Sequence, residues 1–321
     1  MYAFQVPSAR RISRQDTARR ALPNPADPSH RHTAGGNATP LKLSILMPAY
    51  NEERTITRAV EELLLARYPC DVELIVVDDG STDRTGALLA QIKDARVIVH
   101  SHPRNMGKGA GLRSALSLAT GSHIVPFDAD LEYSADDVPR MLAPVIKGRC
   151  DVVYGVRRFG CNTVYQSYRY AKGNRILTRL ANLLFDACLS DLHTCLKLMP
   201  RDMMRSFELH EAGFGLDTEL TALLLRCGAR PFEVPVSYYS RSHAEGKKIT
   251  WRDAVACVWV LLRTRLRSRS SLTRSTREVC ADNPHRPGSS ESGVLDPLKA
   301  EQANSWLANG DRDADVTAAR A

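Results

Sequence analysis

Three carboxylates stand at alternate positions directly after an apolar run of the sequence. The run, residues 124–127, leads into Asp128, Asp130 and Glu132. If the strand continues through them, their side chains share one face, and like charges repel there unless a cation offsets them. Mg²⁺ and Mn²⁺ suit such oxygen ligands, together with substrate phosphate oxygens. The spacing therefore predicts a divalent metal site beside a bound phosphate, with a solvated loop of helix-capping acids as the alternative.

A second acidic pair and a glycine-rich segment supply further polar groups. Asp78 and Asp79 end another apolar run, where a carboxylate can accept hydrogen bonds from a nucleotide base or ribose. Lys108 stands between two glycines at an expected helix start, where backbone N–H groups attract phosphate. An ordinary helix start is the alternative there, and Asp83 is expected to cap a helix. No Walker A spacing and no G-x-G-x-x-G after the first strand occur, which argues against a dinucleotide cofactor.

Arginines in the second half of the chain could bind phosphate through paired hydrogen bonds. The candidates are Arg157, Arg158, Arg169 and Arg241. His193 and His243 have no serine or cysteine partner that the pattern places beside them, so no nucleophilic triad is predicted.

Strands and helices alternate through the first half of the chain. Apolar runs predict strands at residues 43–48, 72–78, 97–100, 123–128 and 151–154. Helical spacing predicts helices at residues 53–67, 83–94, 107–120 and 136–147. The alternation predicts an α/β fold with a mostly parallel twisted sheet flanked by helices. Ligands bind beyond the carboxyl ends of such strands, which is where every polar cluster of this half falls.

The pattern changes beyond residue 160, and composition marks the ends of the ordered part. One or two helices are predicted at 165–189, a strand-like run at 232–241 and a helix at 251–269. Residues 1–40 carry six arginines, two aspartates and five prolines, and residues 270–321 are rich in Ser, Pro, Asp, Asn and Ala. Both ends are predicted to be disordered tails.

The charge balance and the last helix bear on the partners. The net charge of +8 lies in the tails and phosphate-site arginines without a recognition motif, so no nucleic-acid partner is predicted. No run of about 18 apolar residues occurs, so no single spanning helix is expected. The helix at 251–269 has a broad apolar face followed by arginines, which is typical of a helix lying on an anionic membrane. Packing of that face on the domain is the alternative, and the two are compatible.

The ordered series of motifs resembles family 2 glycosyltransferases with the GT-A fold. The motifs are PAYNE, VVDDGSTDRT, NMGKGAG, DADLEY, YGVRRF, GLDTEL, EVPVSYYSR and EGKKITWRD. They are most similar to the polyprenyl-phosphate mannosyl- and glucosyltransferases of the dolichol-phosphate type. The resemblance implies a GT-A catalytic domain at residues 41–250, followed by the membrane-interface helix at 251–269.

The resemblance also implies roles for the donor side of the site. Residues that would line the base and ribose pocket are Pro48, Tyr50, Glu52, Asp78 and Asp79. The pair Asp128 and Asp130 would hold Mg²⁺ or Mn²⁺ and the diphosphate of the nucleotide-sugar, and Glu132 would complete the metal site. Lys108 is expected to contact the donor phosphates.

On the acceptor side, Arg157 and Arg169 would approach a polyprenyl phosphate. Arg241, with Lys247 or Lys248, would clamp phosphate groups on a loop that closes over the donor. Catalysis is expected to depend on Asp130, Arg157 and Arg241.

The implied reaction is a single inverting displacement in which the lipid phosphate attacks the sugar of GDP-mannose or UDP-glucose, at the cytoplasmic face of the membrane. An ionised phosphate needs no strong protein base. A hydroxyl acceptor would need one, and Asp217 or Glu219 would then be the candidates. A third hypothesis is that the protein binds a sugar-nucleotide but has no catalytic activity.

Overall fold

The structure of the protein is a computed structural model that describes residues 41–157, 162–213, 215–241 and 251–267. The predicted tails at 1–40 and 270–321 lie outside the described residues. No helix within the described part is long and apolar enough to cross a membrane.

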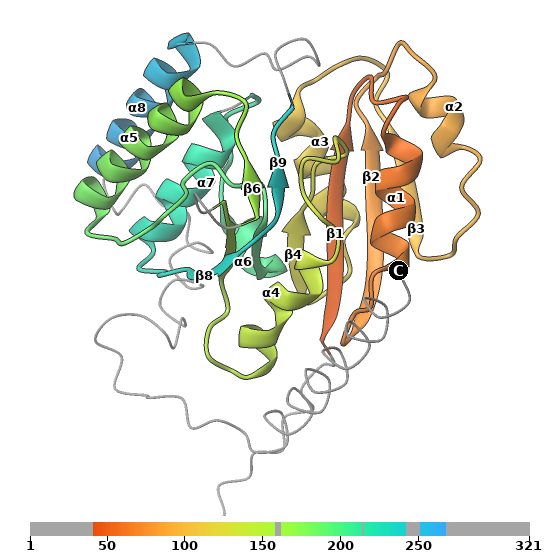
Figure 1. Cartoon of the computed structure of the whole chain (residues 1–321), viewed down its shortest axis with the longest axis horizontal. Helices are drawn as coiled ribbons and strands as arrows, with labels where there is room; N and C mark the ends of the chain where they lie inside the picture. Colours follow the sequence, from red (N-terminus) through yellow and green to blue (C-terminus); the bar gives the residue numbers. More distant parts are fainter. Residues whose placement is uncertain (1–40, 158–161, 214, 242–250, 268–321) are drawn as a thin grey trace, which may run out of the picture. The chain divides into compact units, whose positions relative to one another are not determined.

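Within the described residues, seven strands form one sheet in the order β3-β2-β1-β4-β7-β5-β8 (Figure 1). In chain order these are β1 (Lys42–Ala49), β2 (Asp71–Asp78), β3 (Val97–Ser101), β4 (His123–Pro126), β5 (Val153–Val156), β7 (Lys197–Pro200) and β8 (Phe232–Pro235). Strand β7 runs antiparallel to both of its neighbours, and the other pairs are parallel. The predicted mostly parallel sheet is confirmed.

Helices cover both faces of this sheet (Figure 1). They are α1 (Ile56–Leu65), α2 (Thr85–Leu89), α3 (Lys108–Leu118), α4 (Asp137–Ile146), α5 (Tyr168–Phe185), α6 (Arg201–Ser206), α7 (Gly215–Arg226) and α8 (Trp251–Leu266). The helix predicted at 83–94 is wrong in length, because after Leu89 the chain continues in tight turns, with Ile92 N donating to Leu89 O at 3.1 Å.

The alternation of side chains along β1 explains why the sheet has two cores. Leu43, Ile45 and Met47 point to the face that α1 and α4 cover, and Leu46 belongs to the core shared with α3 and α7. All four side chains are fully buried. A strand with apolar residues on both faces needs helices on both sides, which is the arrangement that the continuous apolar runs of the sequence predicted.

The strand-like run predicted at 232–241 divides into two strands. Its first part is β8, which ends at Pro235. Its second part is β9 (Tyr238–Tyr239), which pairs with β6 (Thr163–Val164) in a separate two-stranded sheet. Val236 N still donates to Val156 O at 3.1 Å, so the pairing with β5 ends one residue beyond Pro235. Strand β9 carries the chain back toward the carboxyl edge of β4, where Tyr133 and Tyr238 form an isolated antiparallel bridge.

Candidate active site

The acidic turn, residues 128–132, follows β4 at the carboxyl edge of the sheet. Strand β4 ends at Pro126, two residues before the predicted end at 128, so Asp128, Asp130 and Glu132 do not alternate along a strand. The chain turns instead, and Leu131 adopts a left-handed backbone with φ of 59°, which is uncommon for a bulky residue. The three carboxylates remain close to one another because the turn is tight, as the bond from Glu132 N to Asp130 Oδ1 at 3.1 Å shows.

Two cations from other parts of the chain contact the acidic turn. Lys108 Nζ lies 2.7 Å from Asp128 Oδ1, and Arg241 Nη2 lies 2.8 Å from Asp130 Oδ2. Arg241 Nη1 also lies 3.5 Å from Glu52 Oε2. The loop after β1, the start of α3 and the segment after β9 therefore meet at the acidic turn, as the convergence of polar clusters predicted.

The acidic turn fits a hard divalent cation. Burial and the charges of Asp128 and Glu132 together raise the pKa of Asp130 to about 7, even though Arg241 opposes them, so negative charge is crowded here. Mg²⁺ is often held by one or two carboxylates while substrate phosphates and water supply the other ligands. The described residues contain no cluster of three or more His, Cys, Asp or Glu side chains arranged for a metal. Two protein carboxylates with substrate oxygens are the arrangement that fits.

We expect the stability of the ligand-free protein to depend on pH through Asp130. An unfolded aspartate titrates at about 4, whereas burial and neighbouring carboxylates raise the pKa of Asp130 to about 7. Between these values the folded protein binds a proton that the unfolded chain has lost, so the contribution of Asp130 to stability is fully present below pH 4 and is lost as pH rises to 7. The loss from this group is at most about 1.4 kcal/mol per pH unit.

Urea unfolding in EDTA at pH 5, 6, 7 and 8 measures this effect. Asp130→Asn cannot titrate, so it serves as the reference for every other group in the protein. The free energy of unfolding of the wild type should fall relative to the variant between pH 5 and pH 7 and then level off. A constant difference across the whole range would contradict the raised pKa.

Two glycines fix the start of α3, which bears Lys108. Gly107 has φ of 92°, a conformation that favours glycine. Gly109 N donates to Ala212 O at 2.9 Å, and a Cβ at Gly109 would lie 2.3 Å from Glu211 O. The loop before α7 therefore packs directly on the helix start. One of the N–H groups expected to attract phosphate is used by the chain itself, and the lysine is held beside the acidic turn.

Asp78 and Asp79 at the end of β2 are both buried. Asp79 accepts hydrogen bonds from Met106 N at 3.0 Å and Gly107 N at 2.7 Å, and His102 Nδ1 lies 2.6 Å from it. Its carboxylate therefore fastens the loop after β3. Contact of either acid with the base or ribose stays a prediction, and Asp79 has a structural role that the sequence did not indicate.

The PAYNE loop after β1 lies at the same edge. Pro48 stands within β1, Tyr50 is exposed, and Glu52 N donates to Thr85 Oγ1 at 2.9 Å. This bond ties the loop to the start of α2. The contact between Glu52 and Arg241 then connects it to the acidic turn.

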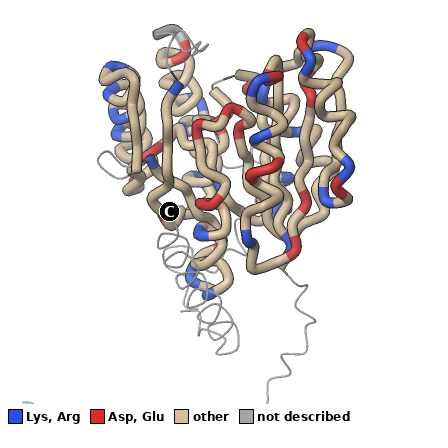
Figure 2. The backbone as a smooth tube through the Cα atoms, turned by 45° about the vertical axis from the view of Figure 1, so that its right-hand side comes forward, with Lys and Arg blue, Asp and Glu red and all other residues tan. Residues whose placement is uncertain are grey.

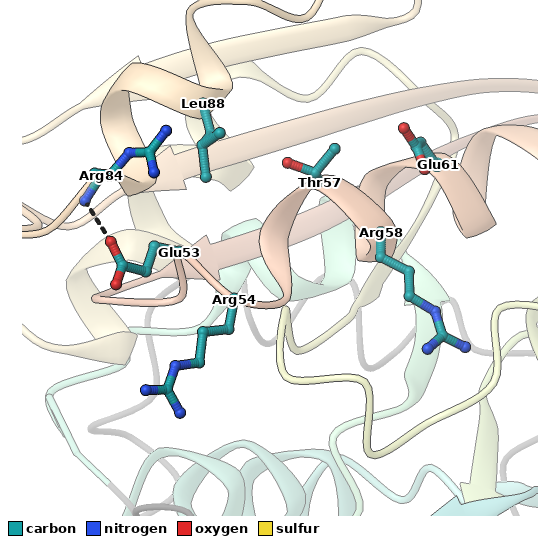
Figure 3. A pocket seen from close by; sticks show the side chains of 7 residues that line it. All are labelled: Glu53, Arg54, Thr57, Arg58, Glu61, Arg84 and Leu88. Atoms are coloured by element: carbon teal, nitrogen blue, oxygen red, sulfur yellow. Dashed lines mark hydrogen bonds between the residues drawn. The ribbon is translucent and has the colours of Figure 1, made fainter.

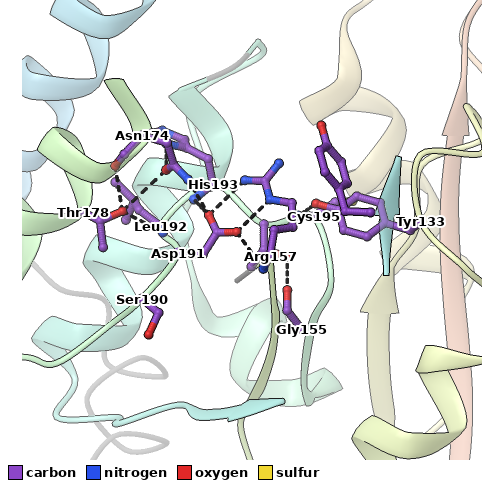
Figure 4. Close-up of polar contacts among 12 residues, drawn as sticks. Tyr133, Gly155, Arg157, Asn174, Thr178, Ser190, Asp191, Leu192, His193 and Cys195 are labelled. Carbon is purple, nitrogen blue, oxygen red and sulfur yellow. Dashed lines mark hydrogen bonds and ion pairs between the residues drawn. The ribbon is translucent and has the colours of Figure 1, made fainter. Parts of the chain in front are cut away.

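A buried polar network surrounds Arg157 (Figure 4). Arg157 Nε and Nη2 lie 2.7 and 2.9 Å from the two carboxylate oxygens of Asp191. Asn174 Nδ2 donates to Asp191 at 2.7 Å, and Asn174 Oδ1 lies 2.9 Å from His193 Nδ1. His193 Nε2 lies 2.9 Å from the hydroxyl of Thr218 on α7. Because Asn174 Oδ1 can only accept, the network assigns the ring proton of His193 to Nδ1.

Burial and the same contacts also determine which groups of this network carry a charge. Burial alone would raise the pKa of Asp191, but Arg157 and Asn174 lower it to about 2. Burial lowers the pKa of His193 to about 4, so this histidine is neutral at physiological pH. Arg157, expected to approach the acceptor phosphate, is thus held by a carboxylate partner that the sequence did not identify.

Other predicted phosphate ligands are more scattered. Arg169 is exposed near the start of α5. Arg158, Lys247 and Lys248 lie outside the described residues.

Lys197 is a charged residue of the site region whose role was not predicted from the sequence. It is fully buried in β7, with Nζ 2.9 Å from Asp217 Oδ1. Asp217 Oδ2 also lies 4.0 Å from Lys108 Nζ, and Cys195 Sγ lies 3.7 Å from that nitrogen. The position of Lys197 inside the apolar run LKLMP could have predicted a buried acidic partner, since a buried lysine needs one.

A cavity of about 440 Å³ lies elsewhere, between α1 and α2 (Figure 3). Its lining residues are Glu53, Arg54, Thr57, Arg58, Glu61, Arg84 and Leu88. Both acidic and basic side chains line it, and Glu53 accepts a hydrogen bond from Arg84 N at 3.2 Å. None of the acidic-turn carboxylates lines it, so it is separate from the candidate active site.

Comparison with known proteins gives a consistent result. A family model described as glycosyl transferase family 2 matches residues 44–207. Glycosyltransferase AglJ of Haloferax volcanii is 30% identical over 204 residues, which are 63% of this chain and 65% of the relative. A low-salt glycan biosynthesis hexosyltransferase of the same organism is 27% identical over 208 residues, 62% of this chain and 48% of the relative. The chain therefore spans less than two thirds of the length of these two relatives.

One further relative and one solved structure extend the comparison. An undecaprenyl-phosphate 4-deoxy-4-formamido-L-arabinose transferase of Enterobacter sp. is 26% identical over 229 residues, 68% of this chain and 67% of the relative. Glucosyl-3-phosphoglycerate synthase from Mycobacterium tuberculosis, crystallised with Mn²⁺, UDP and phosphoglyceric acid, is similar with a TM-score of 0.54 and 22% identity. The match covers 73% of this chain and 81% of that one. It confirms the expected GT-A fold.

Proposed function

The chain belongs to glycosyl transferase family 2, and we propose on that basis that it is an inverting, metal-dependent hexosyltransferase. The donor is a nucleotide-sugar, GDP-mannose or UDP-glucose, and the acceptor is a polyprenyl phosphate. A phosphate oxygen of the acceptor forms a bond to the anomeric carbon while the bond from that carbon to the nucleoside diphosphate breaks. The undecaprenyl-phosphate transferase among the relatives supports the acceptor class.

The donor side of the proposal is supported by the acidic turn and its two cations. Asp128 and Asp130 would hold Mg²⁺ or Mn²⁺, which neutralises charge on a diphosphate leaving group. Lys108 and Arg241 already lie 2.7 and 2.8 Å from these carboxylates. Each would be close enough to contact the diphosphate instead, and preorganised cations of this kind stabilise developing negative charge.

The lowered pKa of Asp217 is the observation that favours a phosphate acceptor over a hydroxyl acceptor. Burial alone would raise its pKa, but Lys197 and Lys108 lower it, which makes Asp217 a weak base. Glu219, the other candidate, is buried and accepts hydrogen bonds from His210 N and Glu211 N at 2.8 and 2.9 Å. A phosphate acceptor is ionised near neutral pH and needs no base.

Replacing Asp217 by asparagine tests this assignment of the acceptor. Transfer to a short-chain polyprenyl phosphate should remain within about tenfold of wild type, because no proton has to be removed. Labelled product in the organic phase measures the rate, and thermal melting checks that Lys197 tolerates the change. Loss of this transfer with unchanged donor binding and melting temperature would show that Asp217 is required even with a phosphate acceptor, and would contradict the argument from its weak basicity.

A membrane surface is the partner that a lipid acceptor requires, and the outward faces of α5 and α8 suit it. The predicted helix at 251–269 forms as α8, and it lies beside α5 (Figure 1). Its apolar residues divide between two sides: Cys257, Val260 and Leu261 are buried, whereas Val255, Trp259 and Leu266 are exposed. Different residues therefore support the two predictions for this helix. One set packs on the domain, and the other forms an exposed apolar face.

Helix α5 adds positive charge to this surface. Basic residues follow one another along it (Figure 2), namely Arg169, Lys172, Arg175 and Arg179. Tyr168, Ile176 and Leu183 stand between or beside them and are exposed. Apolar and basic side chains on one helix surface favour an anionic interface, to which each cation contributes about 1 kcal/mol. We place the enzyme peripherally on the cytoplasmic face of the membrane.

Vesicle co-sedimentation tests the surface with a matched pair of leucines. Leu183 on α5 and Leu65 on α1 are both 81% exposed, so their replacements should have similar effects on the fold. We expect Leu183→Glu to weaken binding to vesicles with anionic lipid by about tenfold, since an apolar side chain is lost and a like charge gained. Leu65→Glu should leave binding unchanged. Equal effects of the two variants would contradict this surface.

A further inference from the structure

Glu132 is held on both carboxylate oxygens by the segment that carries Arg241. Its Oε2 accepts the hydroxyl of Tyr238 at 2.5 Å, and its Oε1 accepts Arg241 N at 2.8 Å. Its backbone carbonyl accepts Tyr239 N at 2.8 Å. Three contacts to residues 238–241 therefore converge on one residue of the acidic turn.

The left-handed residue Leu131 separates Glu132 from the carboxylate before it. A positive φ costs free energy in leucine and persists only where the surroundings fix it. Both neighbouring carboxylates contact Arg241: Asp130 Oδ2 lies 2.8 Å from Nη2, and Glu132 Oε1 accepts the backbone N–H at 2.8 Å and lies 3.7 Å from Nε. The turn thus holds the arginine at two points, its main chain and its head group.

Tyr238 is locked in place by its neighbours. It is 2% exposed, and its ring centroid lies 5.2 Å from that of Tyr133 and 5.8 Å from that of Tyr165. The guanidinium carbon of Arg157 lies 4.8 Å from its ring centroid. The direction of its hydroxyl is therefore set by packing, and a buried hydroxyl that loses its acceptor costs about 1–3 kcal/mol.

We propose that Glu132 and Tyr238 form a positioning pair that holds the Arg241 guanidinium beside Asp130 for contact with the nucleoside diphosphate, and that Glu132 is not a metal ligand. This inference rests on the proposed function. It assigns Glu132 a role different from the one implied by family resemblance. To ligate a metal, the carboxylate would have to share or release the hydroxyl and the N–H that it accepts in this structure.

The experiment measures two affinities in the full-length protein without an acceptor. Mn²⁺ binding is followed by the EPR signal of the free ion, and binding of UDP and GDP by calorimetry at saturating Mn²⁺. The variants are Glu132→Gln, Tyr238→Phe and the double variant, with Asp130→Asn as the reference for a lost metal ligand. Tyr165→Phe is the matched control, because its hydroxyl lies in the same aromatic cluster but donates to Arg157 O at 2.8 Å.

We expect both single variants to keep wild-type Mn²⁺ affinity and to bind the preferred nucleoside diphosphate about tenfold more weakly. The double variant should be no weaker than either single one, because both remove the same interaction. Tyr165→Phe should bind as wild type does. Tyr238→Phe keeps the test valid if Glu132→Gln does not fold.

Loss of Mn²⁺ affinity in Glu132→Gln but not in Tyr238→Phe would overturn the inference and make Glu132 a metal ligand. Unchanged nucleoside diphosphate affinity in both variants would overturn it as well. If the wild-type protein bound neither UDP nor GDP, the proposed function itself would fail, and the inference with it.

Discussion

Asp130→Asn should reduce metal-dependent sugar transfer by about 100- to 1,000-fold, the usual cost of removing one group that stabilises a developing charge. The carboxylate has a raised pKa near 7 because it is buried beside Asp128 and Glu132, and a bound cation would relieve that crowding. Its replacement removes the proposed metal ligand and also the partner of the Arg241 head group. Initial rates at several Mn²⁺ concentrations, with nucleotide-sugar and polyprenyl phosphate saturating, measure the effect.

Asp202→Asn is the matched control for this loss of a carboxylate. Its side chain is 74% exposed and forms an ion pair with the neighbouring Arg201 at 3.1 Å, so the rate should not change. If Asp130→Asn retained both the rate and the dependence on Mn²⁺, the acidic turn would not be the metal site.

Asp191→Asn should lower the free energy of unfolding by about 3–5 kcal/mol, since it leaves a buried arginine without its counter-charge. The Arg157 side chain is only 12% exposed, and its guanidinium lies within 2.9 Å of both carboxylate oxygens. Asn174 and the backbone of His193 share the same carboxylate, so the loss spreads through the network. Urea unfolding at pH 7 gives the free energy.

The same control serves here, because Asp202→Asn breaks an exposed pair of the same chemical type. Exposed pairs contribute about 0–1 kcal/mol, so Asp202→Asn should unfold with nearly the wild-type free energy. An Asp191→Asn protein as stable as this control would show that the Arg157 pair does not hold the second half of the domain together.

The first half of the fold could be predicted because its signals are local. Strands β1 and β2 are continuous apolar runs, and the turn after β4 follows one, so their polar ends were placed correctly at one edge. Strand β7 was not predicted as the antiparallel strand between β4 and β5. Its direction depends on pairing with residues far away in the sequence, and a run of four residues carries no sign of direction.

The parts of the site that escaped prediction are pairings across long sequence separations. Asp191 lies 34 residues from Arg157, and Tyr238 lies 106 residues from Glu132. No sequence spacing predicts contacts between residues so far apart, whereas the two acids of the D-x-D motif are recognised from their local spacing. Asp79 illustrates the converse: its type and place suggested a ligand contact, but the structure shows three protein groups already bound to it.

Helix α8 shows why composition alone could not separate packing from exposure. Val255 and Val260 are both valines of one apolar run, yet the first is 58% exposed and the second is buried. Which of them faces the domain is decided by where α7 and α5 lie. Arg263 provides one such anchor, with Nη2 3.1 Å from the buried Glu219.

Transfer of a labelled sugar to a lipid phosphate tests the central claim most directly. Purified protein with Mg²⁺ or Mn²⁺ and a short-chain polyprenyl phosphate would be given GDP-mannose, UDP-glucose or UDP-N-acetylglucosamine in separate reactions. The proposed function predicts organic-phase product with GDP-mannose or UDP-glucose, lost when EDTA is added. Metal-dependent release of nucleoside diphosphate with a soluble hydroxyl acceptor, and no lipid product from any donor, would contradict it.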